Sequence, residues 1–452
     1  MDSWSYAVRI VTAVVSNVQT LGTISFEEAR WKLAAFAETK CRHSSWIGII
    51  VAALFVIVGT LRYVCSKFRR EKIPFEERDW RAVLITGCDS GLGERAAVRL
   101  AREGFKVFAC VKNIKSEGAR TLRRKSLEFI DTLVGCQVRA PYLDKDDPHA
   151  NDYKDIYEAE VKAVNADDGT LQLVFRDGAT YDRHPVDQIE LENGPIVVLE
   201  MDVRKDAAVK HARDVVARWM LDYDGKLHAV VNNAGVQLGS LADWTKLSDV
   251  TQMIQINFIG TVRVTQAFAP LLFNCADSVA VPRRLINVSS LHGLLKVPGL
   301  SGYAASQHAL DSYTEILRME YKAWRDGIRV VTINPDIFLS PMTSTYRVRI
   351  ERAFGSAPAD VRDYYGEDYL ERVLKFAKIR LESAQEPTLV VDDLVDAVAS
   401  VDPKPRYVGR SWFAFVCLSS CCCCSASLCA RDRCFPFLLR HCNRPKGRSS
   451  AE

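Results

Sequence analysis

Residues 82–111, AVLITGCDSGLGERAAVRLAREGFKVFACV, constrain the fold more than any other part of the chain. They read as an apolar strand, a glycine-rich turn, an amphipathic helix and a second apolar strand, which is a βαβ unit. Gly87 permits the tight turn, Gly91 lets the backbone approach a pyrophosphate, and Gly93 allows the helix to pack closely. The helix N-terminus adds N–H donors and a positive dipole. The pattern therefore predicts an α/β fold with a parallel sheet and a dinucleotide site.

The amino-acid composition excludes only a few classes of protein. The chain has 452 residues, 48% of them hydrophobic and 26% charged, with a formal net charge of +4. These values exclude disordered, collagenous and disulfide-scaffold classes and allow about three domain-sized units. The small net charge gives no argument for nucleic acid, and none is expected as a partner.

Further motifs follow the glycine-rich turn in order: LEMDV, AVVNNAG, INFIGTVRVTQAFAPLL, INVSSLHG and YAASQHAL. Their distinctive residues are Asp202, Val203, Asn233, Ala234, Gly235, Asn257, Ser290 and Tyr303. Together with TGCDSGLG at 86–93, they cover most of residues 81–410 and resemble the short-chain dehydrogenase/reductase family. The phrases INPDIFLSPMT, YYGEDYLERV and DAVASVDPKPRY narrow the resemblance to membrane-anchored retinol and steroid dehydrogenases, with mitochondrial hydroxybutyrate dehydrogenases as near relatives.

The resemblance implies a doubly wound Rossmann domain over residues 81–410 that binds NAD or NADP. The cofactor contacts that it implies are Thr86, Gly87, Asp89, Ser90, Gly91, Leu92, Gly93, Asp202, Val203, Asn233, Ala234, Gly235, Tyr303, Gln307, Pro335 and Ser340. The second strand ends in CVKN, without an acid to bind the adenosine ribose, and Lys112 is placed to meet a phosphate. The missing acid and Lys112 favour NADP. Relatives without the acid also use NAD, so the sequence does not decide between the two cofactors.

Hydride transfer between an alcohol and nicotinamide needs a group that exchanges a proton with the hydroxyl. A tyrosine phenol, with an ordinary pKa of about 10, serves when nearby positive charge favours the phenolate. In the family a lysine one helical turn later supplies that charge, a serine orients the substrate oxygen, and an asparagine helps organise a water. The resemblance assigns Tyr303, Ser290 and Asn257 to these roles, and Gln307 stands in place of the lysine.

Gln307 can bond ribose hydroxyls but carries no charge. At an effective dielectric of ~20 and a separation of ~5 Å, the missing cation removes about 3 kcal/mol, which predicts weakened but not abolished activity. Asp336 is a second departure, because the family has glycine there; its side chain is expected to crowd the cofactor, favour cationic NAD⁺ or point to solvent. Ser340 replaces a threonine that meets the carboxamide, and Lys296 is interpreted as solvent-exposed rather than inward-pointing.

Residues 44–61, SSWIGIIVAALFVIVGTL, carry no formal charge and have basic residues on both sides. Their length predicts a transmembrane helix within 44–65, after an N-terminal segment at 1–43; a buried core helix is the alternative. The heavier basic flank follows the helix, which favours a single-pass protein with the following domain in the cytosol. The family resemblance implies the endoplasmic reticulum.

The tail at 411–452 is rich in cysteine, with eight of the chain's fourteen cysteines between 417 and 442. This clustering argues against a secreted disulfide framework, and the run at 421–424 lacks the spaced pairs of a zinc site, so no metal is expected. Cysteines beside apolar and basic residues are compatible with acylation at a membrane surface. A low-complexity end is the other interpretation.

Residues 133–192 differ in charge from their surroundings, with six Lys/Arg against fourteen Asp/Glu, or −8. Alternating apolar residues and two Asp-Gly turns, at 168–169 and 177–178, predict a small all-β unit that resembles a Tudor or SH3-like barrel. The candidates for an aromatic cage that binds a methylated cation are Tyr142, Tyr157, Phe175 and Tyr181, although these rings are also expected to fill a small core. The insertion enters at the strand edge opposite the nucleotide site, and its acidic charge suits a basic protein partner.

Two functions fit these patterns. The first is a membrane-bound, homo-oligomeric NAD(P)-dependent oxidoreductase that interconverts a lipophilic retinoid- or steroid-like alcohol and its carbonyl. The second is a weakened pseudoenzyme that binds nucleotide and presents the inserted barrel to a partner. The motif order and the predicted anchor support the first, and Gln307 and Asp336 support the second.

Overall fold

The structure is a computed structural model that describes residues 71–78, 80–128, 137–141, 156–165, 170–184, 189–191, 194–273, 281–324 and 327–409. All of them belong to one compact unit. The predicted N-terminal segment, the transmembrane helix at 44–65 and the cysteine-rich tail at 411–452 lie outside the described residues.

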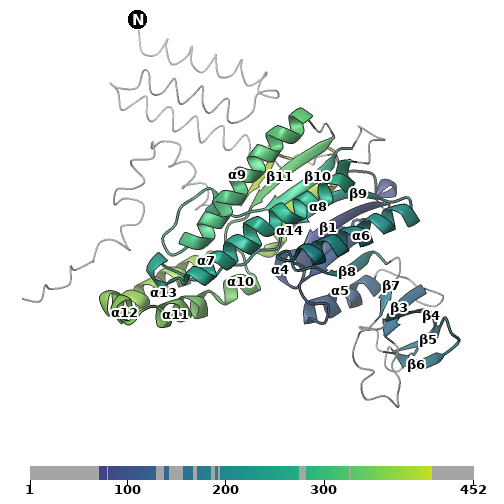
Figure 1. The fold of residues 1–452 in the computed structure, drawn as a ribbon, viewed down its shortest axis with the longest axis horizontal. Coiled ribbons are helices and arrows are strands. Elements are labelled where there is room, and N and C mark those ends of the chain that lie inside the picture. The colour runs from purple at the N-terminus through teal and green to yellow at the C-terminus, as the bar shows by residue number, and fades with distance from the viewer. Residues whose placement is uncertain are drawn as a thin grey trace, which may run out of the picture. The chain divides into compact units, whose positions relative to one another are not determined.

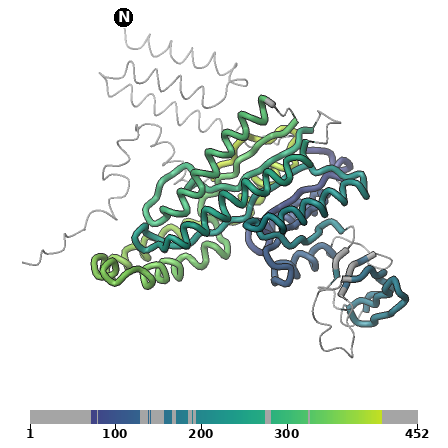
Figure 2. Tube along the Cα trace, in the orientation of Figure 1, coloured from purple at the N-terminus to yellow at the C-terminus, as the bar shows by residue number. Residues whose placement is uncertain are grey.

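A seven-stranded sheet forms the centre, and each of its strand pairs is parallel. Its order is β12-β11-β10-β9-β1-β2-β8, so β12 and β8 lie at opposite edges. Figures 1 and 2 show helices packed around this sheet. The strands are β1 (Arg81–Thr86), β2 (Lys106–Val111), β8 (Ile196–Glu200), β9 (Lys226–Asn232), β10 (Arg283–Val288), β11 (Ile328–Asn334) and β12 (Arg406–Val408). The chain runs outward from β1 to β8 and then returns to β9 on the other side of β1. The predicted doubly wound sheet is therefore confirmed, with its switch point between β1 and β9.

Helices cover both faces of the sheet. Because successive strand side chains point to opposite faces, Val83 and Ile85 join one core cluster while Ala82 and Leu84 join the other. The first cluster packs under α4 (Gly91–Arg102), α5 (Glu117–Leu127) and α14 (Pro387–Ala399). The second packs under α6 (Asp206–Asp222), α8 (Thr261–Phe273) and α9 (Ser301–Trp324). The strands are thus buried on both faces, which explains their continuous apolar runs.

One described helical segment, Leu247–Phe273, is long and apolar enough to cross a membrane. It consists of α7 (Leu247–Met253), the π-helical turn η4 (Ile254–Gly260) and α8. Val264, Phe268 and Leu272 of this segment lie in the core against the sheet. It is therefore a core helix of the Rossmann domain, and it does not bear on the predicted anchor at 44–65.

A separate helical cluster follows β11. It contains α10 (Pro341–Ser344), α11 (Tyr346–Gly355), α12 (Ala359–Tyr365) and α13 (Glu367–Glu382). Their aromatic side chains surround Trp244 of the short helix η3 (Ala242–Trp244), with ring centroids 4.9 Å from Phe354 and 5.4 Å from Tyr365. Two other short helices, η1 (Phe75–Glu77) and η5 (Leu291–Gly293), precede β1 and follow β10. The helical cluster supplies the cavity wall that the parallel strands do not reach.

The insertion forms an antiparallel sheet in the order β6-β5-β4-β3-β7. Its strands are β3 (Gln137–Pro141), β4 (Ile156–Val164), β5 (Leu171–Phe175), β6 (Thr180–His184) and β7 (Glu190–Leu191). The predicted alternation is confirmed in β5, where Leu171, Leu173 and Phe175 are buried. The hairpin turn at 177–178 is also confirmed, with Gly178 at φ +89°, whereas the turn at 168–169 lies outside the described residues. Closure of this sheet into a Tudor or SH3-like barrel stays a prediction.

The aromatic residues of the insertion divide between core and surface. Phe175 is 3% exposed and belongs to the core cluster, and Tyr181 packs against that cluster. Tyr157 is 48% exposed, and Tyr142 lies outside the described residues. Assigning Phe175 to a ligand cage is therefore wrong, because its ring already fills the small core.

Candidate active site

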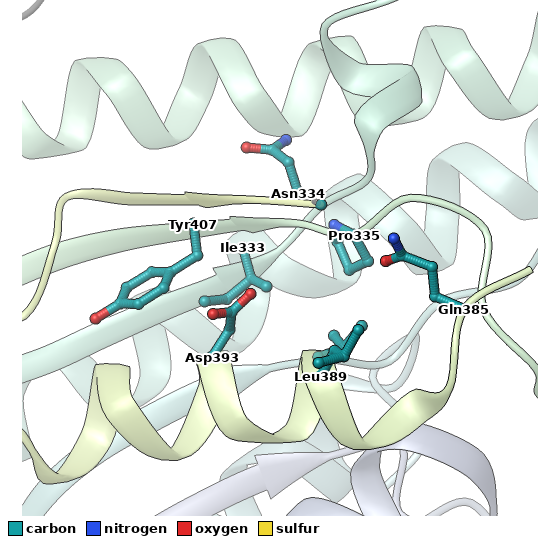
Figure 3. A pocket seen from close by; sticks show the side chains of 9 residues that line it. Ile333, Asn334, Pro335, Gln385, Leu389, Asp393 and Tyr407 are labelled. Atoms are coloured by element: carbon teal, nitrogen blue, oxygen red, sulfur yellow. The ribbon is translucent and has the colours of Figure 1, made fainter. Parts of the chain in front are cut away.

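A cavity of about 390 Å³ lies at the carboxyl ends of the central strands. It brings together most of the predicted site residues: Gly87, Asp89, Ser90, Gly91, Leu92, Asp202, Val203, Asn233, Ala234, Gly235, Ser290, Tyr303, Gln307, Pro335 and Ser340. Three other predicted residues, Thr86, Gly93 and Asn257, do not line the cavity but contact residues that do. A second cavity, between β11 and α14, measures only about 10 Å³ (Figure 3). That is about the room one water needs, so the larger cavity is the candidate active site.

The glycine-rich turn has the close contacts that a dinucleotide site requires. Gly87 and Gly91 adopt φ values of +70° and +69°, a left-handed region that disfavours side chains. A Cβ on Gly93 would lie 2.4 Å from the Gly87 carbonyl oxygen, so the start of α4 packs directly against the turn. The N-terminus of this twelve-residue helix adjoins the cavity wall formed by Ser90 and Gly91. These features fit the pyrophosphate of NAD or NADP.

Thr86 and Asn233 join the ends of β1 and β9. The Thr86 hydroxyl oxygen accepts hydrogen bonds from the backbone N–H groups of Asn233 and Ala234, both at 2.9 Å. The Asn233 side-chain amide donates to the carbonyls of Thr86 at 2.9 Å and Gly87 at 3.1 Å. Thr86 is thus a positioning residue that fixes the floor of the cofactor site.

Two carboxylates form the edge of the cavity near the end of β2. The Asp89 carboxylate accepts the backbone N–H of Lys112 at 2.9 and 3.0 Å. Asp202 pairs with Arg204 at 2.6 Å, and hydrogen bonding by Arg204 lowers the pKa of Asp202 to about 2. Lys112 and Arg204 also line the cavity. Sequence reasoning missed Arg204, although its position two residues after Asp202 was a usable signal.

Ser290 and Tyr303 lie within hydrogen-bonding reach of each other on the cavity wall. Desolvation raises the pKa of Tyr303 above its ordinary value, while a hydrogen bond from Ser290 and the positive charge of Arg349 lower it. The His292 ring meets the Tyr303 ring edge-on at 6.4 Å. Burial lowers the pKa of His292 to about 4, so this neighbour is neutral near pH 7. The structure thus places Ser290 and Tyr303, two residues singled out in the sequence, on the wall of one cavity.

Gln307 lines the same cavity one helical turn beyond Tyr303 and is 4% exposed. Its Oε1 is buried and accepts no hydrogen bond from any of the described residues. A buried amide oxygen without a donor is costly, and a ribose hydroxyl would satisfy it. This unmet acceptor fits the ribose of a nicotinamide cofactor.

Asn257 is 1% exposed and lies in the π-helical turn η4. Its amide nitrogen donates to Ser306 Oγ and the Val236 carbonyl, both at 2.9 Å, and its oxygen accepts the Val236 N–H at 2.8 Å. Ser306 in turn donates to the Tyr303 carbonyl at 2.7 Å. Asn257 therefore holds the catalytic helix α9 against the loop after β9.

Asp336 differs from its sequence-based expectation. It is 6% exposed, its carboxylate pairs with Arg380 at 3.1 Å, and it accepts the Ile337 N–H at 2.7 Å. The alternative that Asp336 points to solvent is wrong, because Arg380 of α13 reaches the carboxylate and compensates its charge. Sequence reasoning missed Arg380, which is 44 residues away along the chain. Lys296 is exposed, as predicted.

Ser340 begins α10. Its hydroxyl accepts the Thr343 N–H at 3.3 Å, and the Thr343 hydroxyl accepts the Ser340 N–H at 2.9 Å, which completes a capping box. Ser340 and Pro335 both line the cavity, as expected for residues near the nicotinamide end. The cap fixes the chain direction where the helical cluster begins.

A doubly wound sheet, a glycine-rich turn and a Ser–Tyr pair on the cavity wall are the features of a short-chain dehydrogenase/reductase. The family model described as short chain dehydrogenase matches residues 161–350. This range contains Asn257, Ser290 and Tyr303. The chain is therefore an oxidoreductase of the class that acts on CH–OH groups with NAD or NADP.

Several characterised proteins are similar over most of the chain. Mouse estradiol 17-beta-dehydrogenase 2 is 29% identical over 350 residues, which cover 76% of this chain and 72% of that one. Human 17-beta-hydroxysteroid dehydrogenase type 2 is 29% identical over 348 residues, covering 75% and 70%. Mouse retinol dehydrogenase 16 is 24% identical over 346 residues, covering 75% and 83%.

A solved short chain dehydrogenase/reductase from Burkholderia phymatum, in complex with NAD, shares the fold. Its TM-score is 0.50 at 18% identity, and the match covers 76% of this chain and 93% of that one. This likeness confirms the Rossmann architecture.

Proposed function

We propose that the protein is a membrane-bound NAD(P)-dependent dehydrogenase that interconverts a lipophilic alcohol, of retinoid or steroid type, and its carbonyl. The observation that carries this proposal is the Ser290–Tyr303 pair on the wall of the 390 Å³ cavity. Apolar side chains share that wall, among them Val297, Leu300, Ile337, Phe338, Met342 and Phe376. The names of the steroid and retinol dehydrogenases to which the chain is similar agree with a substrate of this kind.

The site residues divide the reaction between them. When bound, the nicotinamide accepts or donates the hydride. Tyr303 Oη takes the proton of the substrate hydroxyl during oxidation and returns it during reduction. With substrate bound, the Ser290 hydroxyl donates its one hydrogen bond to the substrate oxygen in place of Tyr303, as negative charge develops there. Gln307 holds the nicotinamide ribose through its unmet amide oxygen.

The predicted anchor at 44–65 would place the domain at a membrane surface, where lipophilic substrates concentrate. The proposal includes a single pass, a cytosolic catalytic domain, an endoplasmic reticulum membrane and a homo-oligomer. Its support is the uncharged run at 44–61 with basic residues on both sides.

Turnover by the full chain in membranes tests this function. With NAD⁺ or NADP⁺ and a panel of retinols and hydroxysteroids, the natural protein should reduce cofactor, and Tyr303→Phe should lose about 1,000-fold in kcat/KM. Tyr364→Phe is the matched control, because Tyr364 is exposed on α12 and outside the cavity. Equal rates for the natural protein and Tyr303→Phe would contradict the proposed role of the tyrosine.

A second candidate is a nucleotide-binding scaffold that presents the insertion to a basic partner. Gln307 in place of a lysine favours it, as does the −8 charge of residues 133–192. Calorimetry with NAD⁺ and NADP⁺, read together with the turnover assay, separates the two functions. Cofactor binding without turnover in the natural protein, combined with turnover by Gln307→Lys, would establish the scaffold.

A further inference from the structure

Because Gln307 carries no charge, another group must supply the positive charge that stabilises the Tyr303 phenolate. We propose that Arg349 of α11, held beside the cavity by two carbonyl groups of its wall, supplies this positive charge where Gln307 stands in place of the lysine. Arg349 is thus a positioning residue that acts on Tyr303, and the inference rests on the proposed dehydrogenase function.

Hydrogen bonds hold the Arg349 side chain beside the cavity. Its Nη1 donates to the Gln237 carbonyl at 3.0 Å and to the Met342 carbonyl at 3.1 Å. Gln237 and Met342 both line the cavity, one after β9 and the other in α10. The guanidinium carbon lies 5.0 Å from the centre of the Tyr346 ring, which forms another part of the wall. Three cavity-wall residues therefore fix the cation in place.

The charge of Arg349 is not neutralised by a carboxylate within the described residues. Its hydrogen-bond acceptors are carbonyls, and its Nε and Nη2 are buried without a partner there. By contrast, Arg347 on the same helix pairs with Glu351, and Arg380 pairs with Asp336. A partly buried cation without a counter-ion acts over a longer range than a paired one, because no opposite charge cancels its field.

The direction of the electrostatic coupling agrees with this geometry. The Arg349 charge lowers the pKa of Tyr303, and Tyr303 reciprocally raises the pKa of Arg349 against the lowering effect of burial. The other groups around the Tyr303 ring are Ser290, which donates a hydrogen bond, neutral His292 and uncharged Gln307. The charges of Asp336 and Arg380 oppose each other. Arg349 thus carries a positive charge that lowers the pKa of Tyr303.

The pH dependence of kcat/KM for alcohol oxidation by the full chain tests the inference. Without the cation the Tyr303 pKa rises, so Arg349→Met should move the acidic limb of the profile about one unit higher, whereas Arg349→Lys should keep it nearly unchanged. Adding Gln307→Lys to Arg349→Met should move the limb back, because a positive charge is restored one helical turn from Tyr303. Arg347→Met is the matched control, since Arg347 is exposed on the same helix.

Two outcomes would overturn the inference. One is a lower kcat or melting temperature in Arg349→Met with an unmoved limb, which is the signature of a purely structural role. The other is failure of Gln307→Lys to restore the limb in a folded double variant. A titration of ¹³Cζ-labelled tyrosine by NMR, with Tyr303→Phe assigning the signal, measures the same shift without substrate. It therefore separates failure of this inference from failure of the proposed dehydrogenase activity.

Discussion

The glycine-rich end and the catalytic end of the cavity differ in how closely their residues match the sequence motifs that predict them. At the glycine-rich end, Gly87 and Gly93 make the close backbone contacts that the sequence predicts. At the catalytic end, Gln307 and Asp336 stand where the family resemblance implies a lysine and a glycine, and two arginines from α11 and α13 lie nearby. Backbone packing therefore restricts the first end to particular residues, whereas charge at the second end can come from any element that reaches the cavity.

The largest expected effect is at the glycine-rich end. In Gly93→Ala the new Cβ would meet the backbone oxygen of Gly87 at 2.4 Å, and neither group is a flexible side chain. We expect NAD⁺ or NADP⁺ affinity to fall about 100-fold, measured by calorimetry. Gly355→Ala is the control, because nothing lies within 4 Å of its added Cβ. Similar affinities in both variants would remove the proposed asymmetry between the two ends.

The ion pair at the catalytic end should have a smaller effect, on stability. Asp336→Asn leaves Arg380 facing a buried position without its counter-charge, and we expect unfolding to become easier by about 2 kcal/mol in urea titrations. The exposed pair Arg347–Glu351 provides the control, since Glu351→Gln should change stability by less than about 0.5 kcal/mol. Addition of Arg380→Leu should recover part of the loss. A double variant as unstable as the sum of the singles would show that the residues do not act as a pair.

Asp202 should make the stability of the folded protein fall at acidic pH. Arg204 lowers its pKa from 3.8 to about 2, so the carboxylate is charged in the folded protein over a range where the unfolded chain binds a proton. Its contribution is complete above the unfolded value and is lost as the pH falls from about 4 to about 2. The stability difference between the natural protein and Asp202→Asn should therefore shrink between pH 6 and pH 3. A constant difference across this range would show that the pairing with Arg204 does not persist in solution.

The smallest effect concerns cofactor choice. Lys112 is exposed at the cavity edge beside Asp202, and a single screened charge there is worth little. We expect Lys112→Ala to weaken the binding of NADP⁺ by about fivefold relative to that of NAD⁺, as measured by competition binding. Lys115→Ala, which changes another exposed lysine after β2, is the control. An unchanged ratio would exclude Lys112 from phosphate recognition.

Local patterns predicted the parts of the molecule that depend on neighbouring residues. The apolar runs of β1 and β2, the glycine spacing and the turn at Gly178 each follow from a few consecutive positions. The roles of Arg349 and Arg380 could not be predicted in this way, because their partners are brought close only by folding. Phe175 shows the same limit, since alternation predicted its strand but did not separate core packing from ligand binding.

The attachment of the insertion has a consequence for regulation. It leaves the Rossmann domain after α5 and re-enters at the start of β8, while the cavity lies at the carboxyl ends of the strands. The insertion is thus attached at the edge of the sheet opposite the one that carries the catalytic residues. Anything bound to the insertion would therefore attach at the edge of the sheet away from Tyr303.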